Sequence, residues 1–250
     1  MPEPGAADFI PRPGTGRIFE RGQRIRLADV DPIGRCRLDS LVRHLQDVAR
    51  DDSAESGLLD PMNWVVRRTL LEVHTAPVFQ EWVELATWCS GHGSRWAERR
   101  TELLGAEGAR VSAVTLWVHV DPATGRPRKL NPDFFEIYGA TATDRKVSAR
   151  NRLPTTPSND AHDEAWMVRF ADLDVLGHVN NAAQWVPVEE VLARTGVAPT
   201  SVRAEVEHRA GVEQHHDTRL RWVETEGGID TWLMTDGVAG SVARVRPIGA

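Results

Sequence analysis

An eight-residue segment of this 250-residue chain occurs twice in similar form. Residues 28–35 read Ala-Asp-Val-Asp-Pro-Ile-Gly-Arg, and 143 residues further on, residues 171–178 read Ala-Asp-Leu-Asp-Val-Leu-Gly-His. Each copy precedes a segment whose apolar residues have helical spacing, and strand-like segments follow. A repeat constrains architecture more than any single motif, because both copies must fold in a similar way. The chain is therefore expected to contain two similar units.

The two copies differ where side chains can do chemistry. The second copy continues as Gly-His-Val-Asn-Asn at 177–181, whereas the corresponding residues 34–38 are Gly-Arg-Cys-Arg-Leu. An imidazole and two carboxamides therefore remain in one copy only. The sequence predicts that the second unit carries the reactive groups.

Composition excludes several classes of protein. The net charge is −6 and the arginines are interspersed with acidic residues, so a basic nucleic-acid-binding face is not expected. No apolar run approaches the roughly 18 residues that a membrane span needs. Residues 1–16 are rich in Pro and Gly and lack the apolar stretch of a secretion signal. Two isolated cysteines, Cys36 and Cys89, fit a reducing compartment. We expect a cytoplasmic protein.

The first unit is expected over residues 17–140, after a flexible segment 1–16. Its helix would be capped by Asp39 or Ser40 and stopped by Gly57. A short strand at 24–28 precedes that helix. The strands expected after it are 64–75, 81–89, 95–104 and 109–120.

The second unit is expected over residues 165–250, after a polar linker at 141–164. It repeats the order with a strand at 167–171 and a helix at 182–193, where Pro187 marks either a kink or a fresh start. Four strands follow, at 202–210, 218–224, 229–235 and 238–245. A strand, one helix and an antiparallel sheet bury their apolar faces when the sheet curls around the helix. We therefore predict an α+β fold of two hotdog units whose sheets join.

One stretch of the second unit carries a resemblance to a known family. Residues 169–181, followed by Glu190, are similar to the acyl-acyl carrier protein thioesterase pattern R-x-x-D-x-D-x-N-x-H-V-N-N with a later Glu. Segments 64–68, 84–88 and 95–99 also resemble strand motifs of that family. The resemblance implies a tandem hotdog in which the second unit is catalytic and the first helps to form the acyl site. It implies hydrolysis of fatty acyl thioesters without a cofactor, with acyl carrier protein favoured over coenzyme A as carrier.

Two positions depart from the family pattern. Leu176 stands where the family has Asn, two residues before His178. Gly211 aligns with the family's acidic residue, and Glu213 could serve instead if the strand bulges. Val212 replaces the family's cysteine, which excludes a cysteine mechanism at that position.

The candidate catalytic residues are Asp174, His178 and Glu213, and the candidate substrate-binding residues are Gly177, Asn180 and Asn181. Asp174 would activate water or, as the less favoured option, attack directly; its alternative role is an Asx turn. His178 would position substrate or act as an acid and base, or would be structural. The two asparagines are more suited to capping the helix than to proton transfer. Glu190 is either solvated or paired.

Three further groups of residues have less specific patterns. We expect no metal at His215-His216-Asp217, because adjacent residues on a strand point to opposite faces. Trp185 lies either in the core or near an acyl tunnel. The basic residues of the linker could contact an acidic carrier protein or could simply be solvated; they are Arg145, Lys146, Arg150 and Arg152.

Alternative functions stay open at this point. An acyl-CoA thioesterase differs only in its carrier. A hotdog hydratase or dehydratase is disfavoured because its P-x-H run is absent. A non-catalytic acyl-thioester-binding protein would normally carry a helix-turn-helix, which neither terminus offers, but the departures at Leu176 and Gly211 keep it in consideration. The oligomeric state also stays open, with a homodimer as one option.

Overall fold

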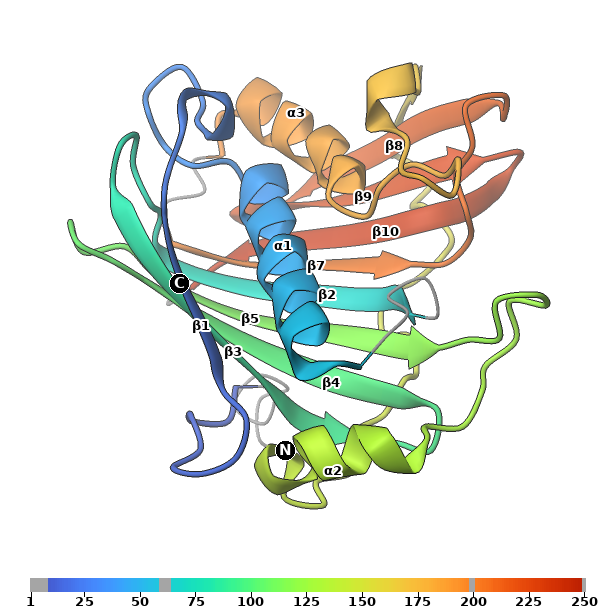
Figure 1. Ribbon diagram of the computed structural model, residues 1–250. Helices are drawn as coiled ribbons and strands as arrows, with labels where there is room; N and C mark the ends of the chain where they lie inside the picture. The colour runs from blue at the N-terminus through green and yellow to red at the C-terminus, as the bar shows by residue number, and fades with distance from the viewer. Residues whose placement is uncertain (1–8, 59–63, 198–200, 249–250) are drawn as a thin grey trace.

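In the part of the chain that the structure describes, ten strands form one antiparallel sheet with the order β1-β3-β4-β5-β2-β7-β10-β9-β8-β6. The computed structural model describes residues 9–58, 64–197 and 201–248. Helices α1 (Leu38–Ser56) and α3 (Val186–Thr195) contact each other on one face of this sheet (Figure 1). The sheet curves around them, which confirms the predicted tandem hotdog. None of the described helices is long and apolar enough to cross a membrane.

In the first unit, the strands after α1 match the predicted segments closely. Helix α1 buries the apolar face formed by Leu41, Leu45 and Val48, and it ends at Gly57 with φ 73°. The strands are β2 (Trp64–Thr75), β3 (Trp82–His92), β4 (Trp96–Gly105) and β5 (Arg110–His119).

The predicted entry strand at 24–28 is wrong. Strand β1 is Phe19–Arg24, and Leu27–Asp29 form a 3-10 turn instead. The Asp29 carboxylate accepts the N–H of Arg26 at 2.7 Å, and this bond closes the turn. The cap of α1 also differs from the prediction, because the N–H of Leu38 is bound by Glu189 of the second unit rather than by Asp39 or Ser40.

The second unit has the same order in shorter form. Its entry strand β6 is His162–Ala165, and residues 170–172 form a 3-10 turn where a strand was expected. A further 3-10 turn at Ala183–Trp185 precedes α3, and Pro187 lies in the first turn of that helix, so the proline marks a fresh start. The remaining strands are β7 (Val202–His208), β8 (Thr218–Thr225), β9 (Gly228–Thr235) and β10 (Val238–Pro247).

The two units share one sheet and one core. Strand β2 pairs antiparallel with β7, with Arg68 opposite Glu207 and Val73 opposite Val202. One apolar cluster contains buried residues of both helices and of both halves of the sheet. The two units therefore bury a common core and cannot slide past each other without breaking a β ladder. The unit boundaries given above remain predictions.

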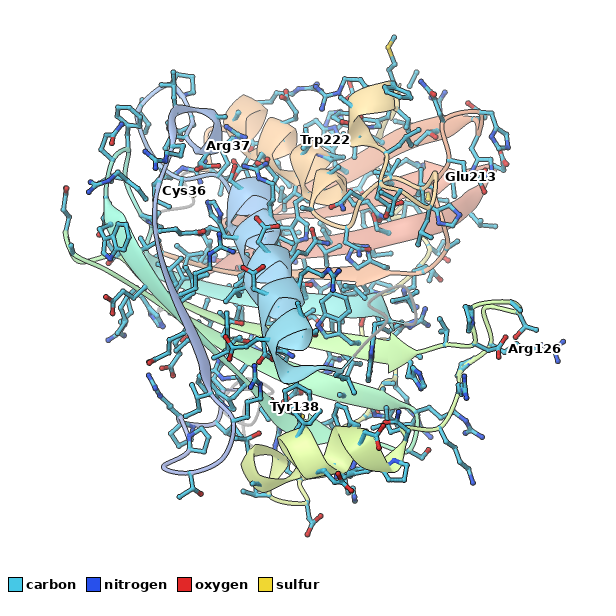
Figure 2. All side chains as sticks on the ribbon, viewed as in Figure 1. Cys36, Arg37, Arg126, Tyr138, Glu213 and Trp222 are labelled. Atoms are coloured by element: carbon cyan, nitrogen blue, oxygen red, sulfur yellow. The ribbon has the colours of Figure 1, made fainter. Side chains whose placement is uncertain are left out.

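Helix α2 (Pro132–Ala142) was not predicted. The Asn131 side chain accepts the N–H of Phe134 at 3.0 Å, and Pro132 occupies the first turn, so the start of this helix is well encoded. The helix packs against β3 beside the C-terminal end of α1 (Figure 1). The Tyr138 hydroxyl lies 2.9 Å from an oxygen of the buried Asp52 on α1 (Figure 2). Helix α2 thus closes one end of the first unit.

Candidate active site

A cavity of about 690 Å³ crosses the junction between the two units. Helix α1 lines the cavity with residues between 46 and 53. Residues of the loop 174–181 of the second unit also line it. The adjoining ends of β2 and β7 line it between these elements. Among the candidate site residues, the cavity is lined by Asp174, His178, Asn180 and Asn181.

Asp174 lies in a tight turn and lines the cavity. Its Oδ1 accepts the N–H of Leu176 at 2.9 Å, and its N–H donates to the carbonyl of His178 at 2.8 Å. Gly177 completes the turn with φ 78°. The Asx-turn role is therefore real, but it engages one carboxylate oxygen. No cation lies within ion-pair distance of Asp174 among the residues that the structure describes.

The first copy builds the same turn and closes it with an ion pair. Asp31 Oδ1 accepts the N–H of Ile33 at 3.1 Å, as its counterpart does. However, Arg35, which replaces the histidine, binds Asp31 at 2.9 Å and reaches Glu189 on α3 at 2.8 Å. At the repeat offset, Glu189 corresponds to Gln46 on α1, which lines the cavity. The space beside the second loop is a cavity. The equivalent space beside the first loop is occupied by the side chains of Arg35 and Glu189.

His178 is half-exposed and faces an acidic partner. Its Nε2 lies 3.7 Å from Oε1 of Glu213, and the two residues form an isolated β-bridge. Glu213 lies outside the cavity lining, so it contacts the imidazole rather than the cavity. A Cβ added at Gly211 would lie 3.3 Å from the His178 ring. A larger side chain at position 211 would therefore crowd His178, whereas Glu213 places a carboxylate beside the ring.

The other predicted binding residues have separate places. Asn180 Oδ1 accepts the N–H of Ala182 at 2.8 Å, so this side chain closes an Asx turn directly before the 3-10 turn. Asn181 lines the cavity, whereas Gly177 shapes the turn and does not line it. Leu176, at the family's Asn position, presents an apolar side chain to the cavity. Of the two adjacent glutamates on α3, Glu190 is exposed and Glu189 is buried.

Gln184 and His208 are two polar residues of the cavity wall that the sequence reading missed. Both are buried. The Gln184 amide nitrogen donates to the carbonyl of Val179 at 3.2 Å, and its oxygen lies 3.0 Å from Nδ1 of His208. Because that oxygen can only accept, Nδ1 carries the proton and Nε2 does not. The pair therefore fixes the backbone directly after His178. Gln184, three residues after Asn181 on the helix predicted at 182–193, was the available signal.

His208 is expected to make folding sensitive to mild acid. Burial, with a smaller contribution from the Arg67 charge, lowers the pKa of His208 to about 4. The unfolded chain binds a proton there at higher pH than the folded chain, so stability is full above the ordinary pKa of about 6.5 and falls with decreasing pH. Between pH 7 and pH 5 this group should account for a loss of about 2 kcal/mol in unfolding free energy.

Urea titrations of the wild type and of His208→Gln at both pH values test this expectation. The variant should lose less stability on acidification than the wild type. The other buried histidine with a lowered pKa, His44, is present in both proteins and cancels from the difference. Equal pH dependence in both proteins would contradict a neutral, buried His208.

Burial determines the roles of three further residues in or near the cavity. Cys89 lines it, but burial raises the pKa of its thiol to about 11, so this group is protonated at neutral pH and is a poor nucleophile. Val212 is fully buried. Trp185 is also fully buried, in the shared core and outside the cavity lining.

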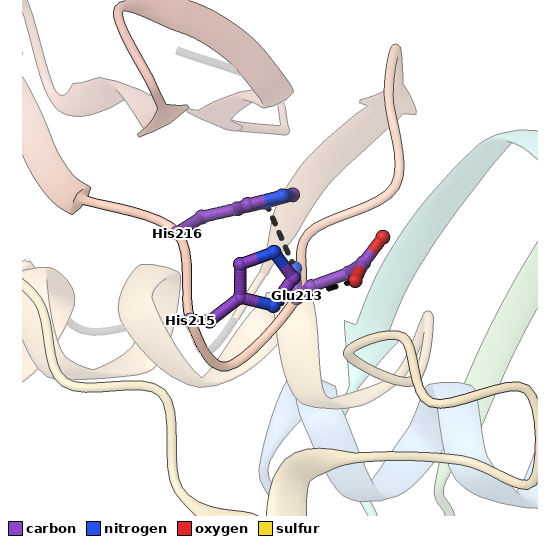
Figure 3. A group of neighbouring side chains, drawn as sticks. All are labelled: Glu213, His215 and His216. Carbon is purple, nitrogen blue, oxygen red and sulfur yellow. Dashed lines mark hydrogen bonds and ion pairs between the residues drawn. The ribbon is translucent and has the colours of Figure 1, made fainter.

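The segment 213–217 is a turn, not a strand. The expectation that adjacent side chains point to opposite faces, and so cannot share a metal, is therefore wrong for this segment. The N–H of His216 donates to the carbonyl of Glu213 at 3.2 Å. Glu213, His215 and His216 consequently lie together (Figure 3). Asp217 does not belong to this group.

The linker arginines are not equivalent. Arg145 binds Glu98 and donates to the carbonyl of Ser90 at 3.0 Å, so it is part of the first unit's structure. The N–H of Arg152 binds the Glu207 carboxylate. Lys146 and Arg150 are exposed.

The arrangement combines a carboxylate with no ion-pair partner among the described residues, an imidazole with its own acidic partner and a cavity of about 690 Å³. The N–H groups of Ala182, Gln184 and Trp185, at the start of the helical segment after Asn181, are already bound by oxygens of the chain. The side-chain amide of Asn181, which lines the cavity, is the polar group of this segment that can meet developing negative charge. Such a set can activate water against a carbonyl group whose apolar substituent occupies the cavity.

Two family models match this chain. The acyl-ACP thioesterase N-terminal domain matches residues 16–138, and the acyl-ACP thioesterase C-terminal domain matches residues 155–244.

Curated relatives and solved structures agree with these matches. An uncharacterized protein of Mycobacterium tuberculosis is 27% identical over 215 residues, which cover 86% of each chain. The palmitoyl-acyl carrier protein thioesterase of Arabidopsis thaliana is 27% identical over 207 residues, covering 72% of this chain and 50% of the plant protein. The structure of a putative oleoyl thioesterase from Lactobacillus plantarum superposes with a TM-score of 0.77 at 20% identity, covering 95% and 99% of the two chains. The 12:0-ACP thioesterase of Umbellularia californica gives the same score and identity, covering 92% and 96%.

Proposed function

Because this chain belongs to the acyl-ACP thioesterase family, whose members are thiolester hydrolases, we propose that it hydrolyses fatty acyl thioesters of acyl carrier protein at the loop 174–181. The observation that supports this most is the cavity shared by both units. It joins Asp174 and His178 to a space between α1 and the sheet of the first unit, where an acyl chain can lie.

Asp174 acts as the general base in the proposed mechanism. Its carboxylate takes a proton from a water molecule while the water oxygen attacks the carbonyl carbon. The oxyanion is stabilised by the side-chain amide of Asn181, which lines the cavity. The C–S bond then breaks, and the thiolate leaves with the electron pair and takes a proton from His178. The proton that Asp174 took from water replaces it on the ring, which lies 3.7 Å from the Glu213 carboxylate.

The choice of carrier rests on the exposed linker cations. Carrier proteins of this kind are acidic, and Lys146 and Arg150 are exposed linker cations that can meet them. The double variant Lys146→Glu/Arg150→Glu should raise KM for acyl carrier protein substrates about tenfold, because opposed charges slow association and weaken the complex. KM for the same acyl group on coenzyme A should be unchanged.

Steady-state kinetics on both carriers make this comparison, with Arg145 left in place because its substitution would disturb the first unit. Equal changes on both carriers would remove the linker from the docking surface. If the wild type prefers coenzyme A thioesters, the enzyme is an acyl-CoA thioesterase with the same mechanism.

A panel of acyl chain lengths on both carriers tests the activity itself, with free thiol as the readout. Release of thiol with at least one chain length supports the proposal. A non-catalytic acyl-thioester-binding role is the second candidate, and Leu176 and Gly211 favour it because the family has polar groups there. Saturable binding of acyl thioesters without release of thiol would establish that role and contradict hydrolysis.

A further inference from the structure

The turn between β7 and β8 gathers three potential metal ligands. Donor atoms of Glu213, His215 and His216 all lie within 4.8 Å of one another (Figure 3). Oε2 of Glu213 is 3.5 Å from Nδ1 of His215. Around a tetrahedral zinc ion with bonds of about 2.0–2.2 Å, neighbouring ligand atoms are separated by about 3.4 Å. The first pair therefore already has a separation suited to a metal ion.

The two histidines differ in mobility. His215 is 75% exposed, so its ring can turn toward an ion at little cost. His216 is held in place, because its Nδ1 accepts the N–H of Glu213 at 3.2 Å and lies 2.8 Å from the Thr235 hydroxyl. Since Nδ1 accepts, the proton of the neutral ring is on Nε2, 3.8 Å from an oxygen of Asp236. An ion that binds His216 must therefore displace either that proton or the contacts of Nδ1.

We propose that Glu213, His215 and His216 form a binding site for a divalent zinc-class ion. Imidazole and carboxylate ligands suit Zn²⁺ and neighbouring late transition metals, and not Ca²⁺ or Mg²⁺, which prefer oxygen alone. The site lies beside the catalytic loop, because the other oxygen of Glu213 is 3.7 Å from Nε2 of His178.

Metal binding and the His178 contact compete for one carboxylate. An ion bound by Glu213 pulls this side chain toward His215 and away from the His178 ring. Under the proposed function, on which this step rests, loss of that partner slows protonation of the leaving thiolate. Zn²⁺ should therefore inhibit hydrolysis without entering the acyl cavity.

Titration calorimetry with Zn²⁺ on tag-free protein measures the binding directly, and absorption of bound Co²⁺ reports the ligand set. We expect a Kd of about 1–50 μM for the wild type, in the range of partly exposed three-ligand sites. His215→Ala should weaken binding by more than tenfold. His162→Ala, which removes another exposed histidine from the same unit, is the matched control and should bind like the wild type.

Thioester hydrolysis is then measured with and without saturating Zn²⁺. The wild type and His162→Ala should be inhibited at least fivefold, and His215→Ala should keep its activity in both conditions. Equal Zn²⁺ affinity in His215→Ala and the wild type, or no binding below about 1 mM, would overturn the site. Binding without inhibition would overturn its link to His178. Absence of hydrolysis with every acyl thioester contradicts the proposed function instead, and the calorimetry still decides the metal site.

Discussion

Asp174→Asn should lower kcat by about 10²- to 10⁴-fold, the usual contribution of a general base. The substitution removes the charge and the proton-accepting capacity of the side chain. It retains the oxygen that accepts the N–H of Leu176, so the turn and the fold should be preserved. Single-turnover hydrolysis of an acyl thioester measures the change, and circular dichroism and thermal unfolding check the fold.

The first copy of the repeat supplies a matched control for this experiment. Asp31 builds the same turn but is engaged by Arg35 and lies outside the cavity lining. Asp31→Asn should therefore leave kcat within about twofold of the wild type, since it touches no reacting group. Similar losses in both variants would mean that the aspartates serve only the turns, and an active Asp174→Asn would remove Asp174 from the mechanism.

Glu189→Ala should destabilise the whole chain by about 3 kcal/mol, because it breaks a buried ion pair. Glu189 is 8% exposed and joins the two units, since it binds both Arg35 and the first N–H of α1. Its removal leaves a buried guanidinium with Asp31 alone and leaves a helix N-terminus uncapped. Urea unfolding should show the loss, with the midpoint lowered and the slope unchanged.

The adjacent glutamate is the control for this prediction. Glu190 is exposed, and no hydrogen bond or ion pair joins its side chain to another described residue. Glu190→Gln should change the unfolding free energy by less than about 0.5 kcal/mol. Comparable losses in the two variants would show that charge on α3, rather than the contact across the units, governs stability.

Much of the fold could be predicted because the repeat and the strand patterns are local signals. The segment predicted at 64–75 is strand β2 from its first residue to its last, and Gly57 ends α1 as expected. The differences between the copies predicted which loop keeps the polar groups, whereas the contribution of both units to the acyl site was implied by the family resemblance. In each case, residues near in sequence determine the local structure.

The first of the misses is local, and the others arise where distant residues decide. Residues 24–28 alternate as a strand does, but the Asp29 carboxylate closes a turn. The start of α3 at Val186 sets which glutamate is buried, so Glu189 and not Glu190 meets Arg35. The start of α2 was readable from Asn131-Pro132, but the packing of its apolar face against β3 was not.

The residues 213–217 show the same limit in another form. Adjacent side chains point to opposite faces only in a strand. The turn that begins at Glu213 means that this rule does not apply to residues 213–217. Gln184 and His208 form a pair only because the 3-10 turn at Ala183–Trp185 and the end of β7 come together, and no spacing in the sequence indicates this.

The guanidinium of Arg35 has a consequence for stoichiometry. Duplication of a unit by itself gives a polypeptide two equivalent sites. In this chain the ion pair between Arg35 and Glu189 occupies the site of the first unit. Under the proposed function, each polypeptide is therefore expected to bind one fatty chain at a time, with residues of the first unit forming part of the cavity wall.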